Sequence, residues 1–311
     1  MSSFSGSIRE SAQNDEIHLA TSEISFSQIL VGTDFSKSAA QALALAVTIA
    51  EFFDSEIIVI HAVKPVIYGD SQEPMPPEVL NAQLETAKYD MKELIASDPR
   101  LAKLRVQTKV DFGRAVDLID QVAKTTKSTL IVVGSHGAGG LKKFTFGSVA
   151  ETILRQSSCP TLIVGPQCQV EHHPFRSILF ATDLETTGLR PAQYASALAE
   201  HVDGRLTLLH VIEKRPDSPE FDFDLFEDRL RKQLRGLLPS DVELFCNPKI
   251  RLEYGSPAQL ITSIARSEAT SLIIVGAHHQ SALADHAPWS TLSHVIRETR
   301  CGVLVVRSHL I

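Results

Sequence analysis

The sequence contains few of the features that mark secreted, metal-binding or membrane-spanning proteins. Its cysteines show no CxxC spacing, so they predict neither a zinc site nor a disulfide framework: Cys159, Cys168, Cys246 and Cys301. No apolar run approaches the roughly 18 to 20 residues needed to cross a bilayer. The start of the chain also lacks the basic end and apolar core of a signal peptide. We therefore expect reduced, mostly buried thiols, no metal site, no membrane partner and a cytoplasmic location.

A basic surface and the common catalytic loops are also missing. The formal net charge is −7, and no run of Lys and Arg follows a predicted helix, which argues against nucleic acid as a partner. The phosphate-binding motif GxxxxGK[ST] does not occur, and neither do the HxGH and SGGxDS loops of some adenine-nucleotide enzymes. A dedicated catalyst is therefore not indicated, and we assign no catalytic residue.

What the sequence does contain is a glycine-rich loop between two apolar strands. The runs Leu130–Val133 and Thr161–Val164 predict strands buried on both faces, and the first ends abruptly at glycine. Glycine can adopt a positive φ or let a ligand approach the backbone closely. The loop glycines are Gly134, Gly137, Gly139 and Gly140.

A short amphipathic helix follows this loop, beginning at Gly147 and Ser148. Unpaired backbone N–H groups and the positive end of the helix dipole meet at such a helix start, which predicts an anion site. We expect the anion to be a nucleotide phosphate. Ser148 could alternatively act only as the N-cap of the helix. Lys142 and Lys143 could neutralise phosphate charge or could simply be solvated.

The chain consists of two copies of one unit. Residues from Ser177 repeat those from Gln28, and residues from Tyr254 repeat those from Phe112 at an offset of 142 (254 − 112). We expect a flexible or disordered tail (1–26), a first domain (27–166), a linker (167–174) and a second domain (175–311).

The sequence pattern of each copy predicts a doubly wound α/β/α sandwich. Strands and helices alternate, and right-handed crossovers make a five-stranded parallel sheet of order 3-2-1-4-5. Ligands bind such sheets outside the carboxyl ends of the strands, where the strand order reverses. In the first copy Asp34 and Gly134 follow the two strands at this point, so both should line one crevice.

These residues resemble the universal stress protein family. Its nucleotide-binding members carry glycine, two residues, glycine, nine residues, glycine and then Ser or Thr, which Gly134, Gly137, Gly147 and Ser148 match. The stretches GTDFS and SCPTLIV are further landmarks. The likeness is strong over 28–165 and weaker over 177–306, so the chain looks like a tandem member. The family implies an adenine nucleotide α-hydrolase-like fold that pairs through its last strand, either in a homodimer or between the two domains.

The resemblance also implies an adenine-nucleotide site in the first domain, holding ATP with or without Mg²⁺. Ala150 departs from nucleotide-binding relatives, which often have a hydroxyl there. The adenine and ribose side would be lined by Gly32, Thr33, Asp34 and Ala62, and the phosphate side by Val133, Gly134, His136, Gly137, Gly147, Ser148 and Val149.

The second copy lacks the glycines of this site. At the offset of 142, Gly137 becomes His279 and Gly147 becomes Trp289. A left-handed conformation costs a residue with a side chain roughly 1 to 2 kcal/mol, so we expect a degenerate second site. A metal cluster there is not favoured, although the loop carries His278, His279, Asp285 and His286.

Other single residues have structural explanations. Asp34 could cap the helix after it rather than bind a ligand, and His61 and His210 are expected to be hydrogen-bonded structural imidazoles. Cys159 and Cys301 are expected to pack without reactive chemistry.

The leading hypothesis is therefore a regulatory ATP-binding protein with a role in the stress response, loaded in its first domain. The alternatives are a slow ATPase that uses the same pocket, and a non-catalytic structural or interaction protein. A receiver-type phosphorylation module is set aside. Such a module needs an acidic pair after its first strand and a lysine at the end of its fifth strand, and here Phe35 and Gly165 stand near those positions.

Overall fold

The computed structural model describes residues 24, 26–64, 76–127, 129–137, 147–184, 189–214, 221–240, 242–244, 246–277 and 287–307. Several residues considered above lie outside this part of the chain: Gly139, Gly140, Lys142, Lys143, His278, His279, Asp285 and His286. The side chain of Trp289 and all but two residues of the predicted tail also lie outside it.

The first half alternates strands and helices as the hydrophobic pattern predicts. Ser36 is the N-cap of the first helix, where its Oγ accepts a hydrogen bond from the backbone N–H of Ala39 at 3.2 Å. The elements are β1 (Gln28–Gly32), α1 (Lys37–Phe53), β2 (Glu56–Val63), α2 (Pro77–Ser97), the 3₁₀ turn Leu101–Lys103, β3 (Arg105–Phe112), α3 (Ala115–Thr126), β4 (Leu130–Gly134), α4 (Ser148–Gln156) and β5 (Thr161–Val164).

The second half repeats this order. Its elements are β6 (Ser177–Ala181), α5 (Leu189–His201), β7 (Arg205–Ile212), α6 (Phe223–Gly236), the 3₁₀ turn Val242–Leu244, β8 (Lys249–Tyr254), α7 (Pro257–Ser267), β9 (Leu272–Ala277), α8 (Ala287–Glu298) and β10 (Gly302–Arg307). No helix among the described residues is long and apolar enough to cross a membrane.

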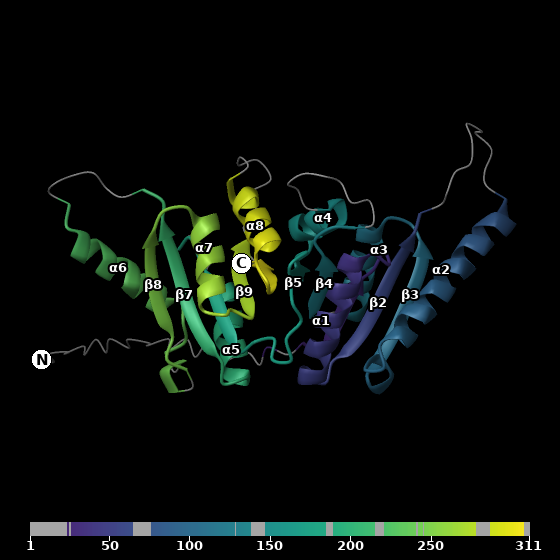
Figure 1. Cartoon of the computed structure of the whole chain (residues 1–311), viewed down its shortest axis with the longest axis horizontal. Coiled ribbons are helices and arrows are strands. Elements are labelled where there is room, and N and C mark those ends of the chain that lie inside the picture. Colours follow the sequence, from purple (N-terminus) through teal and green to yellow (C-terminus); the bar gives the residue numbers. More distant parts are fainter. Residues whose placement is uncertain are drawn as a thin grey trace, which may run out of the picture.

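The two halves share one ten-stranded sheet of order β3-β2-β1-β4-β5-β10-β9-β6-β7-β8 (Figure 1). Each half is parallel and has the predicted order 3-2-1-4-5, which confirms the fold class. At the junction β5 and β10 pair antiparallel, with Leu162 opposite Leu304. These two residues are repeat equivalents (304 − 162 = 142), so a pseudo-twofold axis passes between them. The expected pairing of the last strands of the two copies, β5 and β10, is thus made within one chain.

Two hydrophobic cores lie on opposite faces of the sheet, and both continue across the junction. One contains buried residues of α1, α2, α5 and α6. The other contains buried residues of α3, α4, α7 and α8. The shared cores make the two copies parts of a single packed body.

An aromatic cluster closes the junction on the first face. Phe26 lies 6.2 Å from its repeat equivalent Phe175, measured between ring centroids, and 6.5 Å from Tyr194 of α5. Phe53 at the end of α1 stacks on His201 of α5 at 4.6 Å. Phe26, which the predicted boundary assigned to the tail, is fully buried here, so the ordered packing of the first domain includes this residue.

A second close contact across the junction involves Gly165, just after β5. A β-carbon on Gly165 would lie 1.9 Å from the backbone oxygen of Ile296 in α8. No side chain fits between the end of β5 and α8, so glycine is required there by contact.

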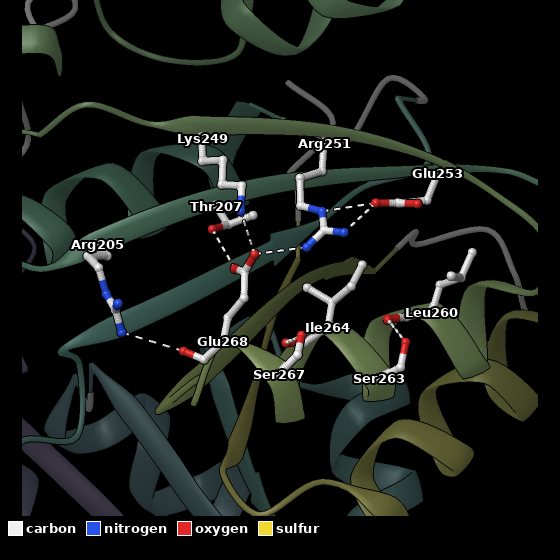
Figure 2. A network of polar contacts seen from close by, with 10 residues as sticks. All are labelled: Arg205, Thr207, Lys249, Arg251, Glu253, Leu260, Ser263, Ile264, Ser267 and Glu268. Carbon is white, nitrogen blue, oxygen red and sulfur yellow. Dashed lines mark hydrogen bonds and ion pairs between the residues drawn. The ribbon is translucent and has the colours of Figure 1, made fainter.

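A polar network attaches the end of α7 to β7 and the edge strand β8 of the second domain (Figure 2). The Glu268 carboxylate accepts hydrogen bonds from Lys249 at 2.9 Å, Arg251 at 2.9 Å and Thr207 at 3.0 Å. Burial by itself raises the pKa of Glu268, but these three hydrogen bonds outweigh burial and hold the pKa below its ordinary value.

We predict that Glu268→Gln lowers the free energy of unfolding by about 1 to 2 kcal/mol at pH 7, because charge-assisted hydrogen bonds are lost. The folded-state pKa is depressed, so the contribution is present above the ordinary value of 4.5 and lost as the pH falls through the folded pKa. Urea unfolding of both proteins at pH 7 and pH 3 measures this. A difference that is equal at both pH values would contradict the charge argument. Glu85→Gln, in an exposed pair with Lys88, is the control and should change nothing measurable.

We predict that Gly165→Ala lowers the free energy of unfolding by about 1 to 3 kcal/mol, because the added methyl overpacks the junction against the Ile296 carbonyl. Gly236→Ala is the matched control, since a β-carbon there meets nothing within 4 Å. Thermal unfolding of the two variants measures the difference, and equal midpoints would show that the junction tolerates the methyl.

Candidate functional site

The predicted crevice lies where the strand order of the first domain reverses. Strands β1 and β4 are neighbours there, with Val31 opposite Val132, and β2 and β5 extend the sheet on either side. Gly32 and Gly134 are the last residues of their strands. The residues that follow them therefore meet at one edge of the sheet.

The turn after β1 holds Asp34 at this edge. Thr33 is buried, its N–H bonds to the backbone oxygen of Ile60 at 2.8 Å, and its hydroxyl accepts from the N–H of Phe35 at 3.1 Å. Phe35 adopts a left-handed φ of 61°, so the chain turns sharply. Asp34 is exposed, and its Oδ1 accepts from the N–H of Ser36 at 3.1 Å. One carboxylate oxygen thus orders the turn before α1.

The other carboxylate oxygen of Asp34 faces the glycine loop. A β-carbon on Gly137 would lie 2.5 Å from Asp34 Oδ2. The structure thus brings together two residues that are 103 positions apart (137 − 34) and were singled out independently. A side chain at position 137 would displace the carboxylate.

Gly134 is required by a different contact. A β-carbon there would lie 2.4 Å from Ser38 Oγ and 2.9 Å from the Ser38 backbone oxygen. Absence of a side chain lets the first turn of α1 pack against the end of β4. The hydroxyl of Ser38 is buried and has no hydrogen-bond partner in the structure.

The start of α4 lies beside the end of β4. The N–H of Gly147 bonds to the backbone oxygen of Ser135 at 2.8 Å, which joins the helix start to the residue after β4. Gly147 is the N-cap, so the alternative role of Ser148 as N-cap is wrong: Ser148 is the first helical residue and is exposed. Within the described part of the chain no side-chain hydrogen bond caps this helix, and its first backbone N–H groups have no intrahelical acceptor.

The conformational argument for the loop glycines was wrong where the structure tests it. Gly113 and Gly255 are the positive-φ glycines among the described residues, and Gly134, Gly137 and Gly147 are not among them. A close backbone contact requires glycine at Gly134, whereas a β-carbon at Gly137 would meet only the end of the Asp34 side chain and one at Gly147 would lie 3.3 Å from the Ser135 backbone oxygen. Gly137 and Gly147 therefore give no support to the expected cost of roughly 1 to 2 kcal/mol for left-handed side chains at the equivalent positions of the second copy.

The remaining predicted residues lie around the same edge. Ala62, near the end of β2, and Val149, in the first turn of α4, are half-buried, while Val133 is buried within β4. His136 is half-buried, and its Nδ1 lies 2.9 Å from the hydroxyl of Ser135. Ser135 and Ser38 were not predicted from the sequence. Both are small polar residues, and their position close to the predicted site residues was the only signal for them.

His61 is a structural imidazole, as predicted. Its Nδ1 lies 2.9 Å from the backbone oxygen of Thr33, and its ring packs on Phe35 at 4.4 Å. The second domain repeats this arrangement, with His210 Nδ1 2.9 Å from the Thr182 oxygen and Leu184 at φ 64°. The turn that carries Asp34 is thus reproduced around Asp183.

Metal and thiol chemistry find no support in the described part of the chain. No group of three or more His, Cys, Asp or Glu residues there could hold a metal ion. Burial raises the pKa of Cys159, Cys168 and Cys301 to about 12 in each case, which keeps these thiols protonated and unreactive at neutral pH.

Comparison with known proteins agrees with the geometry. A model of the universal stress protein family matches residues 25–165 and 174–307. The chain belongs to the universal stress protein family. A universal stress protein from Mycobacterium tuberculosis is 26% identical over 295 residues, covering 91% of this chain and 97% of the relative. One from Thermus aquaticus is 33% identical over 143 residues, covering 45% of this chain and 98% of the relative.

Solved structures show the same universal stress protein fold. A crystal structure of a universal stress protein from Archaeoglobus fulgidus has a TM-score of 0.66 and 20% identity, and the match covers 91% of this chain and 98% of that one. At this identity the likeness concerns the fold. The two-domain arrangement is thus shared over nearly the whole length of both chains.

We predict that Gly134→Ala and Gly137→Ala affect stability differently. The first places a methyl against the backbone of Ser38 and should lower the free energy of unfolding by about 1 to 3 kcal/mol. The second meets only the end of the exposed Asp34 side chain, which can rotate, so its effect should stay within about 0.5 kcal/mol. Urea titration of both variants measures the contrast. Equal losses would show that the two glycines serve the same packing role.

Proposed function

We propose that this universal stress protein binds an adenine nucleotide, with ATP as the expected ligand, in its first domain and serves as a nucleotide-dependent regulator in the stress response. The observation that carries the proposal is the contact of Gly137 with the Asp34 carboxylate beside the uncapped start of α4. A hydrogen-bond acceptor for a ribose or an adenine and a set of amide donors for phosphates thereby border one crevice.

The phosphate side fits an anion by its backbone. The first N–H groups of α4 have no side-chain cap, and the helix dipole adds a partial positive charge there. Gly137 and Gly147 add no side chain beside these donors. In the proposal the phosphates lie against Gly137, Gly147 and Ser148, and Mg²⁺, if it accompanies them, is held chiefly by the ligand.

We further propose that the second domain holds no nucleotide. Its turn around Asp183 is equivalent to that around Asp34, but the sequence places His279 and Trp289 where the first domain has glycine. In the first domain, a β-carbon on Gly137 would lie 2.5 Å from the Asp34 carboxylate, and a β-carbon on Gly147 would lie 3.3 Å from the Ser135 backbone oxygen. Steric contact thus replaces conformational strain as the reason for an empty second site.

The release of nucleotide from purified, denatured protein tests the proposal. We predict about one equivalent of adenine nucleotide per chain at saturation, and a loss of affinity of at least about tenfold in Gly137→Ala, because the methyl displaces the Asp34 carboxylate. Gly236→Ala, with open space around its new methyl, is the matched control and should bind as the parent does.

The outcomes of this experiment are distinct. No bound adenine nucleotide, in protein as purified or after incubation with ATP, would refute the binding function. Two equivalents per chain would refute the empty second site. Phosphate that accumulates over hours with the parent protein but not with Gly137→Ala would favour the alternative of a slow ATPase in the same pocket.

A further inference from the structure

The pseudo-twofold symmetry at the junction is broken at the position just after Val164 in β5 and its equivalent in β10. Gly165 follows β5, and its repeat equivalent is Arg307 at the end of β10 (307 − 165 = 142). On one side Gly165 lies directly against the backbone oxygen of Ile296 in α8. On the other side the Nε of Arg307 donates to the backbone oxygen of Leu154 in α4 at 3.1 Å. Leu154 and Ile296 are themselves equivalents (296 − 154 = 142).

The hydrogen bond from Arg307 to Leu154 is buried and lies at the C-terminal end of α4. Only 7% of Arg307 is exposed, and burial together with the nearby charge of Arg155 lowers its pKa. Leu154 lies in the last turn of α4, where carbonyl groups lack intrahelical donors and the helix dipole is negative. The guanidinium thus satisfies an otherwise unpaired acceptor and compensates the charge at that end.

Helix α4 connects this contact to the proposed phosphate site. It has nine residues, or about 13 Å of helix at 1.5 Å per residue, and its other end carries Gly147 and Ser148. The first turn is tied to β4 through the bond from Gly147 to Ser135. A short helix that is held at both ends cannot slide or tilt without breaking one of these contacts.

Arg307 is in turn held from the second domain. Its backbone oxygen accepts a hydrogen bond from Arg190 at 2.7 Å. Arg190 lies in the first turn of α5, shortly after the turn that carries Asp183. A continuous set of contacts therefore runs from the ligand edge of the second domain, through Arg190 and Arg307, to the far end of α4.

We propose that Arg307 of the second domain is a positioning residue for the nucleotide site of the first. It fixes α4 along its axis and so places the amide donors at Gly147 and Ser148 where phosphates meet them. This inference rests on the proposed function. The second domain then contributes to binding without holding a ligand of its own.

Two substitutions in the full-length chain test the proposal. Arg307→Met keeps a long unbranched side chain but removes the hydrogen-bond donor and the positive charge. Arg251→Met is the matched control, because it breaks the Glu268 network and destabilises the second domain without touching α4. Isothermal titration with ATP should show about three- to tenfold weaker binding in Arg307→Met and binding within twofold of the parent in Arg251→Met. Arg307→Lys, which keeps the cation, should recover most of the affinity.

Hydrogen exchange of the ligand-free proteins gives the second readout. Backbone amides of residues 151–154 should exchange several times faster in Arg307→Met than in Arg251→Met, because only the first variant releases the end of α4. Equal ATP affinity in Arg307→Met and parent, or equal loss in Arg307→Met and Arg251→Met, would overturn the positioning role. If the parent binds no ATP, the proposed function fails. Exchange at residues 151–154 then decides separately whether Arg307 holds α4.

Discussion

The antiparallel pairing of β5 with β10 is the constraint on which the rest of the structure depends. A five-stranded parallel sheet of this order ends in a short apolar strand, and an exposed strand of that kind invites association with other chains. Here each copy covers the last strand of the other, and the ladder continues through ten strands. The helices then pack on both faces across the junction, so neither core is complete with one copy alone.

The same pairing brings α4 and α8 close to the axis. Both helices follow the fourth strand of their copy, and in the first copy α4 carries the candidate phosphate donors. Their far ends meet the other copy's last strand at its C-terminal end: Ile296 meets Gly165, just after β5, and Leu154 meets Arg307, the last residue of β10. The interface between the domains is therefore built from the helix that also borders the site. Packing at the junction and geometry at the site share one element.

Much of this could be read from the sequence because the relevant signals are local or repeated. The apolar runs at Leu130 and Thr161 gave strands with the expected limits, and the offset of 142 revealed the duplication. The convergence of Asp34 with the end of β4 at Gly134 followed from the rule for strand-order reversal. These inferences need only periodicity, spacing and topology.

Other features depend on contacts that no short pattern encodes. The reason for glycine at Gly134 is the backbone of Ser38, and the reason at Gly137 is a carboxylate far away in sequence. The sequence suggested a positive φ or the close approach of a ligand at these glycines, whereas the structure shows contacts with other parts of the chain. The burial of Arg307 was equally invisible, since a lone arginine at the end of an apolar strand resembles a solvated residue.

Covalent fusion of the two copies changes what a single substitution can do. When two identical chains pair about a true axis, any replacement near that axis occurs twice and must suit both sides. In this chain each position is encoded separately, so glycine is kept at 165 while arginine stands at 307. Duplication followed by divergence thus lets the two halves differ at equivalent positions beside the axis, which an assembly of identical subunits cannot do.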